Sequence, residues 1–260
     1  MTLTQRIRKT EFKTGSLCSL AVRKTFSFMF GEEQCISCGK PSFDIPLCRQ
    51  CVELLKSEIV TQKEKLCSVC GKILLSEKEK CMACREAPVI KSADSVFPLL
   101  TYRLWKKKLL FSWKIEDKRA LSSLFASLIY SQIERLFPDC KPAIVPVPPR
   151  PGKIRKKGWD QIDELCSFLE YTYGLKVLKM LERKTAFQQK KLDREQRLDL
   201  SRSSYALSHK YFKNKQNSIP EQVILIDDVL TTGVTVENCA VLLKKAGVLN
   251  VFAMTIFIVD

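Results

Sequence analysis

The feature of the sequence that most restricts the fold is a run of four C-x-x-C pairs between residues 35 and 84. The first two pairs are spaced C-x2-C-x9-C-x2-C, and the next two C-x2-C-x10-C-x2-C. Each C-x-x-C turn presents two thiolates, and structural Zn²⁺ prefers four such ligands in a tetrahedron. The spacing therefore predicts two structural zinc sites, because four cysteines leave no coordination position for water. The predicted ligands are Cys35, Cys38, Cys48 and Cys51 for one site and Cys67, Cys70, Cys81 and Cys84 for the other.

Two alternatives stay open for the cysteine pairs. Ligation could interleave, with pairs one and three sharing one metal, or the pairs could be redox active, although no βαβ pattern surrounds them. A secreted disulfide scaffold would need a signal peptide, and basic residues interrupt every apolar stretch of residues 1–34. No window approaches the roughly eighteen apolar residues of a membrane span. We therefore expect a cytoplasmic protein without a membrane span, where such pairs bind metal more often than they form disulfides.

Beyond residue 85 the pattern changes to alternating strands and helices. Apolar runs predict a strand or hairpin at 92–102 and strands at 143–149, 175–181, 222–228 and 248–259. Helical spacing predicts helices at 118–137, 159–174 and 235–247. Continuously apolar strands that alternate with helices indicate a parallel sheet covered on both faces. The predicted fold class is therefore α/β. Ligands of such sheets bind at the carboxyl ends of the strands.

The segment "VILIDDVLTTGVT" places two carboxylates at one of these strand ends. Asp227 and Asp228 can accept hydrogen bonds from two vicinal hydroxyl groups. The loop behind them leads into a helix, and its backbone N–H groups and hydroxyls can hold a phosphate. A diol beside a phosphate describes a ribose 5-phosphate. The alternative is a solvated strand end followed by a turn that Thr235 caps.

The same segment resembles the phosphoribosyl-diphosphate (PRPP) motif of type I phosphoribosyltransferases. The stretches "IVPVPPRPGKIRKKGWDQ" (144–161) and "RKTAFQQKKLDREQR" (183–197) resemble signature blocks of the ComF family. That resemblance implies a type I phosphoribosyltransferase-like domain joined to a small N-terminal zinc-ribbon domain, in competence proteins needed for DNA uptake. We expect a basic N-terminal arm over residues 1–32 that could be disordered, a double zinc ribbon over 33–90 and the phosphoribosyltransferase-like domain over 91–260.

The resemblance also implies roles for individual residues. Asp227 and Asp228 would bind the ribose hydroxyls, and the pyrophosphate loop would contain Pro148, Pro149 and Arg150. The 5-phosphate would lie against Thr231, Thr232, Gly233, Val234 and Thr235. Two blocks depart from the family's usual residues. The chain has Lys157-Gly158-Trp159-Asp160-Gln161 in place of R-G-F-N-Q, and Leu200 and Tyr205 in place of asparagine and phenylalanine. Lysine lacks the bidentate geometry of arginine, and aspartate cannot donate a hydrogen bond as asparagine does.

Charge points to a polyanionic partner. The formal net charge is +16, and residues 141–220 hold eighteen Lys and Arg against eight Asp and Glu. A basic stretch beside an aromatic residue is typical of single-stranded DNA binding. The predicted nucleic-acid or diphosphate contacts are Lys153, Arg155, Lys156, Lys157 and Trp159, although Trp159 could equally belong to the core.

Three functions follow from these patterns. The first, which we favour, is natural transformation, with binding of single-stranded DNA and a phosphoribosyl ligand such as PRPP. The second is an active phosphoribosyltransferase that uses PRPP and Mg²⁺ with an unknown acceptor. The third makes the zinc ribbons an adaptor for a DNA-translocating helicase.

Overall fold

The computed structural model of the protein describes residues 33–60, 65–152, 157–184, 204–214 and 218–259. Its centre is a four-stranded parallel sheet in the order β3-β8-β7-β4. The strands are β3 (Ser95–Thr101), β4 (Ala143–Pro146), β7 (Gln222–Leu230) and β8 (Asn250–Ile258). Because all four run in one direction, the segments that follow β4 and β7 leave the sheet at the same edge.

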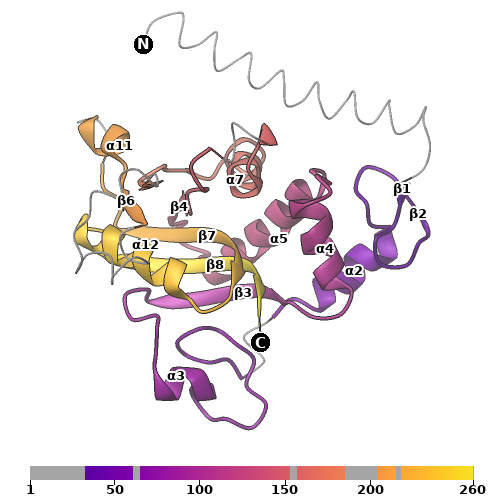
Figure 1. The fold of residues 1–260 in the computed structure, drawn as a ribbon, viewed down its shortest axis with the longest axis horizontal. Helices are drawn as coiled ribbons and strands as arrows, with labels where there is room; N and C mark the ends of the chain where they lie inside the picture. The colour runs from indigo at the N-terminus through magenta and orange to yellow at the C-terminus, as the bar shows by residue number, and fades with distance from the viewer. Residues whose placement is uncertain (1–32, 61–64, 153–156, 185–203, 215–217, 260) are drawn as a thin grey trace, which may run out of the picture.

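Alternate side chains of the sheet point into two separate cores. Ile224 and Ile226 of β7 pack in one core with three helices, which are α4 (Lys106–Lys114), α5 (Leu121–Leu136) and α7 (Gln161–Tyr171). Val223 and Leu225 pack in the other core with α12 (Val234–Lys245). Figure 1 shows α4, α5 and α7 grouped on one side of the sheet. The prediction of an α/β fold with a parallel sheet flanked by helices is confirmed.

The prediction of a strand over residues 175–181 is wrong for most of these residues. Val177 makes only an isolated parallel bridge to Ile144. The chain forms its next strand at β5 (Leu181–Arg183), which pairs antiparallel with β6 (Tyr205–Leu207) outside the central sheet. A short helix, α11 (His209–Lys213), follows. An apolar run alone did not distinguish a sheet strand from a connection that touches the sheet at one residue.

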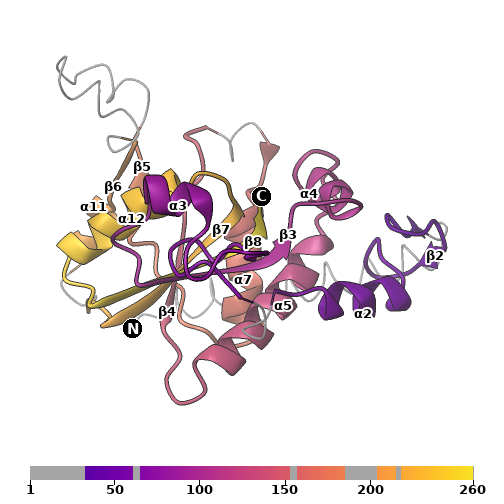
Figure 2. The same ribbon diagram turned by 90° about the horizontal axis from the view of Figure 1, so that it is seen from below.

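The cysteine pairs lie in two small units, which we call ribbon 1 (residues 33–57) and ribbon 2 (residues 65–86). Ribbon 1 consists of the hairpin β1 (Glu33–Gln34) and β2 (Pro41–Ser42) followed by α2 (Arg49–Ser57). Ribbon 2 has one antiparallel bridge, between Leu66 and Ile73, and ends in α3 (Met82–Glu86). The two ribbons stand well apart in both views (Figures 1 and 2).

Both ribbons are connected to the edge strand β3. The Val60 N–H, just after ribbon 1, donates to the Leu99 carbonyl at 2.8 Å. Gly71 of ribbon 2 lies so close to β3 that an added Cβ would come within 2.5 Å of the Pro98 ring. A proline inside β3 fits its place at the edge, where a strand needs fewer N–H donors. None of the helices in the described part of the chain is both long and apolar enough to span a membrane.

Candidate functional site

Each ribbon brings four cysteine sulfurs together. In each cluster all four Sγ atoms lie within 4.8 Å of one another. The Sγ atoms of Cys38 and Cys48 are 3.6 Å apart, and those of Cys70 and Cys81 are 3.8 Å apart. A Zn–S bond of about 2.3 Å in a tetrahedron separates two sulfurs by about 3.8 Å, whereas a disulfide needs about 2.05 Å. Both clusters therefore have the donors and spacing for one zinc ion each. The pairs combine in sequence order, so the interleaved alternative is wrong.

Backbone N–H groups prepare one thiol of each cluster for metal binding. Burial alone would raise the pKa of Cys35, but the N–H groups of Cys48, Cys38 and Ser37 lower it to about 6. In ribbon 2, burial is likewise outweighed by the N–H groups of Cys70, Cys81 and Val69, which lower the pKa of Cys67 to about 7. Burial and the neighbouring thiols raise the pKa of the Cys51 thiol. Zn²⁺ would displace the remaining protons, since it binds thiolates.

Asp227 and Asp228 lie near the end of β7, as the sequence predicts, and the structure gives them different neighbours. The Asp228 Oδ2 atom forms an ion pair with the Lys114 ammonium of α4 at 2.6 Å. The Asp227 Oδ1 atom accepts from the Asp228 N–H at 2.8 Å. Burial and the Asp228 carboxylate raise the pKa of Asp227 to about 7. The Asp228 N–H and Lys114 lower this pKa, but by less. Asp227 is half-buried.

One further polar group lies beside Asp227. Thr255 of β8 pairs with Asp227 in the parallel register. Among the described residues, the Thr255 hydroxyl is the only buried side-chain oxygen or nitrogen without a hydrogen-bond partner. A buried hydroxyl without a partner is costly and uncommon. The interior of the strand end therefore has a hydroxyl group with hydrogen-bonding capacity that no described residue uses.

The loop behind the aspartates ends at the first turn of α12. The helix begins at Val234, and Gly233, with φ at +84°, is its N-cap without a side-chain cap hydrogen bond. Thr235 therefore lies inside the helix, and the alternative in which it caps the turn is wrong. The first turn of a helix directs backbone N–H groups outward, which favours an anion. The predicted phosphate position therefore coincides with the start of a helix, where the Val234 N–H lies 3.5 Å from the Thr232 hydroxyl oxygen.

A strap made of residues 89–92, which follows ribbon 2, covers the other side of this loop. A Cβ on Gly233 would lie 2.7 Å from the Ile90 side chain. The Glu237 carboxylate of α12 accepts from the backbone N–H groups of Lys91 and Ser92 at 2.7 and 2.8 Å and from the Ser92 hydroxyl at 2.8 Å. The strap therefore fixes the position of the first turn of α12.

The predicted pyrophosphate loop follows β4, next to β7 in the sheet. Pro146 pairs with Ile226, so Pro148, Pro149 and Arg150 leave the sheet at the same edge as Asp227. The two prolines are half-buried, and Arg150 is exposed. The sheet thus brings the two predicted loops to one edge, although they lie about eighty residues apart in the sequence.

The basic stretch is only partly described, because Lys153, Arg155 and Lys156 lie outside the described residues. Lys157 is held by protein groups: its ammonium donates to the Lys114 carbonyl and pairs with Asp117 at 2.7 Å. Trp159 is only 7% exposed, and its indole N–H donates to Asp117 at 3.1 Å. Asp160 is buried and caps α7 by accepting from the N–H groups of Ile162 and Asp163. The aspartate that departs from the family pattern is thus an N-cap.

Sequence reasoning missed Lys114 and Glu237. Both act across long sequence separations, on Asp228 and on residues 91–92 respectively. The only local signal for α4 was the segment "KKKLLFSWK", whose lysines weaken its apolar pattern. Glu237, in the first turn of the predicted helix after the PRPP-like loop, could have been marked as a first-turn acid.

The structure defines an α/β protein with a parallel sheet, two four-cysteine clusters and a carboxylate pair at a strand end. No protein-family model matches the chain. It is 25% identical to the competence protein ComFC of Streptococcus pneumoniae (strain ATCC BAA-255 / R6) over 189 residues, which is 72% of this chain and 78% of that protein. It is also 25% identical to the competence protein ComFC of Bacillus subtilis (strain 168) over 224 residues, 85% of this chain and 76% of that protein.

These similarities extend over most of the chain and of both relatives. Together with the two four-cysteine clusters, which fit a double zinc ribbon, they confirm the resemblance to the ComF family.

Proposed function

We propose that this protein acts in DNA uptake during natural transformation and that it binds single-stranded DNA and a phosphoribosyl ligand. Its similarity to two proteins named as competence proteins supports a competence-related function. The observation that carries the ligand proposal is the edge of the sheet where the β7 carboxylates, the first turn of α12 and the loop after β4 meet.

The proposed ligand is a sugar phosphate of the PRPP type. Asp227 and Asp228 would accept hydrogen bonds from the ribose hydroxyls, which requires Lys114 to share or release Asp228. Residues 231–235 would hold the 5-phosphate. Arg150 and the basic stretch after it would face the diphosphate. Mg²⁺ would accompany PRPP, because it binds phosphate oxygens with few protein ligands.

A second candidate is an active phosphoribosyltransferase. The observation that favours it is the position of Asp227 at the strand end directly beside the Asp228 carboxylate, where burial and Asp228 raise the pKa of Asp227 to about 7. A general base works best when its pKa lies near the working pH. Asp227 could then take a proton from an acceptor while the basic loop neutralises the leaving diphosphate. Release of pyrophosphate from PRPP in the presence of an acceptor would distinguish this enzyme from a binding protein.

The test of the ligand site is isothermal calorimetry of the zinc-loaded protein with PRPP and Mg²⁺. We expect binding by the wild-type protein and its loss in the double variant Asp227→Asn/Asp228→Asn, because amides lose the charge that orients the diol and the metal. Zinc content, measured by atomic absorption, should remain at two ions per chain in both proteins. Undiminished PRPP affinity in the double variant would refute the assignment of the aspartates.

The test of DNA binding is the salt dependence of affinity for a short single-stranded oligonucleotide. Each phosphate contact contributes about −0.7 to the slope of log affinity against log salt. We expect the pair Arg155→Ala/Lys156→Ala to reduce the slope by about 1.4 if both residues contact phosphates. A wild-type protein that binds no oligonucleotide even at low salt would contradict the proposed function.

A further inference from the structure

Helix α4 has two chemically different sides. Leu109, Leu110 and Trp113 are buried and pack in the core beneath the sheet. Lys107, Lys108 and Phe111 are exposed on the other side. Phe111 lies four residues after Lys107 and three after Lys108, so both lysines are its neighbours on the helix surface. We call this exposed surface, with the loop that precedes it, the α4 face. It comprises Tyr102, Arg103, Trp105, Lys107, Lys108 and Phe111.

The α4 face lies in a strongly basic part of the chain. Residues 103–119 hold seven Lys and Arg against two acidic residues. Some of these cations are neutralised: Lys106 pairs with Glu58 at 2.5 Å, and Lys114 pairs with Asp228. Among the described residues, no carboxylate forms an ion pair with Lys107 or Lys108. Their charges therefore face solvent, where a polyanion can reach them.

Aromatic rings alternate with these cations. Phe111 is 53% exposed, although burial of a phenylalanine ring is favourable. Tyr102 and Trp105 are partly buried and pack against the core, which holds them in place. The Lys107 ammonium lies 5.7 Å from the centre of the Tyr102 ring. Rings beside cations are the combination that binds single strands, since bases stack on the rings while cations contact the backbone.

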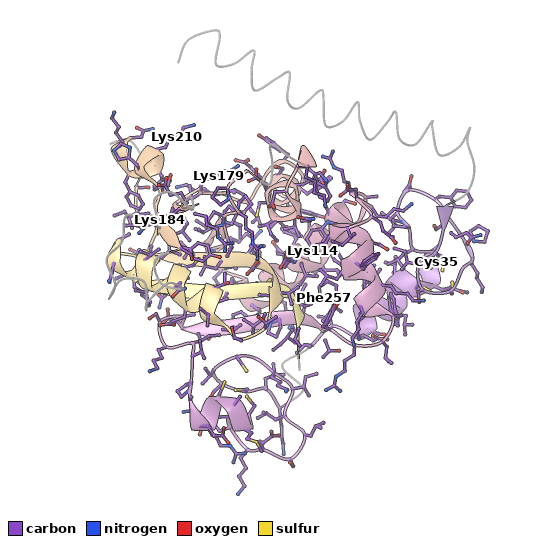
Figure 3. All side chains as sticks on the ribbon, in the orientation of Figure 1. Cys35, Lys114, Lys179, Lys184, Lys210 and Phe257 are labelled. Carbon is purple, nitrogen blue, oxygen red and sulfur yellow. The ribbon has the colours of Figure 1, made fainter. Side chains whose placement is uncertain are left out.

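The α4 face is continuous with the strand-end site. Lys114, in the last turn of α4, pairs with Asp228, and its carbonyl accepts from Lys157 at the end of the predicted basic stretch. Figure 3 shows Lys114 between α4 and the sheet. A strand on the α4 face would therefore extend toward Lys157.

We propose that single-stranded DNA binds to the α4 face, with its phosphates on Lys107 and Lys108 and a base stacked on Phe111. The inference rests on the proposed DNA binding and assigns it a surface. Trp159, the aromatic residue predicted from the sequence to contact DNA, is buried, whereas Phe111 is accessible. The exposed Leu104 and Ile115 extend the apolar part of the surface.

The experiment is fluorescence anisotropy with a labelled oligothymidylate and full-length, zinc-loaded protein at several salt concentrations. We expect Lys107→Ala/Lys108→Ala to weaken binding and to reduce the salt slope by about 1.4. Phe111→Ala should weaken binding about tenfold without changing the slope, because it removes stacking and no charge. Phe111→Tyr should retain wild-type affinity.

Two matched controls come from other parts of the molecule. Lys210→Ala/Lys213→Ala removes two exposed lysines from α11, which lies far from α4 (Figure 3). Phe43→Ala removes a ring that is 61% exposed on ribbon 1. Both controls should bind DNA as the wild-type protein does. A second measurement uses Trp105: oligothymidylate should quench the tryptophan emission, and Trp105→Phe should abolish the quenching.

The outcomes separate this inference from the proposed function. If the wild-type protein binds DNA and the α4 variants bind equally well, the α4 face is refuted and DNA binding stands. If the wild-type protein binds no DNA, both fail. If the α4 variants lose binding to vesicles containing phosphatidylglycerol but keep their DNA affinity, the face binds an anionic membrane and the inference is overturned.

Discussion

At the scale of single residues, the two adjacent aspartates differ because, within the described part of the chain, only Asp228 forms an ion pair. Asp228 pairs with Lys114, whereas burial and Asp228 itself raise the pKa of Asp227 from 3.8 to about 7. The pKa of this acid is higher in the folded state than in the unfolded state. It therefore opposes folding at any pH where the acid ionises more readily in the unfolded chain. Its cost is absent below about pH 4 and grows as the pH rises to about 7. At neutral pH, Asp227 therefore lowers the free energy of unfolding.

The raised pKa of Asp227 predicts how Asp227→Asn changes the stability of the protein without ligand. The amide can still accept from the Asp228 N–H but carries no charge, so the variant should be more stable than the wild-type protein. The gain should be larger at pH 8 than at pH 5.5, with a difference of about 2 kcal/mol. Urea denaturation at both pH values measures it. Asp228→Asn is the comparison variant: it removes the repulsion from Asp228 but leaves Asp227 buried and loses the Lys114 pair, so its gain should be smaller than that of Asp227→Asn. An equal gain for Asp227→Asn at both pH values would contradict a raised pKa.

At the scale of elements, the sequence predicted what depends on local pattern. β7 and β8 were predicted from continuous apolar runs, and α5 from helical spacing. The four C-x-x-C pairs and the carboxylate strand end likewise carry their chemistry within short segments. Helix α4 was missed because its lysines obscure the pattern and its burial comes from tertiary packing. The antiparallel pair β5–β6 was missed because about twenty residues separate its strands. Lys114 and Glu237 depend on contacts that no local pattern records.

The attachment of ribbon 2 to β3 can be tested with two equivalent glycines. Gly39 and Gly71 each follow the second cysteine of a pair and have φ near +74° and +72°. A Cβ on Gly39 would meet nothing within 4 Å, whereas one on Gly71 would lie 2.5 Å from the Pro98 ring and 2.6 Å from the Val96 carbonyl. Gly39→Ala should therefore cost only the backbone strain, about 1 kcal/mol. Gly71→Ala should cost a further 1–3 kcal/mol, roughly, because β3 and the ribbon must separate. Urea denaturation of both variants provides the comparison, and equal losses would show that ribbon 2 does not rest on β3.

At the scale of the whole molecule, the two ribbons lie next to different sites. Ribbon 1 continues into Glu58, which pairs with Lys106 in the first turn of α4. Ribbon 2 continues into the strap at residues 89–92, which holds Gly233 and Glu237 at the start of α12. Figures 1 and 2 show the ribbons apart from each other, with the sheet between the elements they contact. The metal clusters are therefore placed to stabilise two separate surfaces, the α4 face and the loop at residues 231–235.

This arrangement predicts different consequences for the loss of each zinc site. Cys48 and Cys81 are equivalent, because each is the third ligand of its cluster and the N-cap of the helix that follows. Serine is a good N-cap, so Cys48→Ser and Cys81→Ser should remove a metal ligand while each helix keeps its start. Each variant should lose about one zinc ion, measured by atomic absorption, because three thiolates hold the metal less tightly than four.

Binding should then separate the two variants. Cys48→Ser should weaken oligothymidylate binding more than PRPP binding, since α4 loses the support of ribbon 1. Cys81→Ser should weaken PRPP binding more than oligothymidylate binding, because the strap over Gly233 loses its anchored ribbon. Anisotropy and calorimetry on the same preparations measure the two affinities, and far-UV circular dichroism checks that the central sheet remains folded. Equal losses of both ligands in both variants would mean that the ribbons stabilise the molecule as one unit, and the separate support of the two sites would then be abandoned.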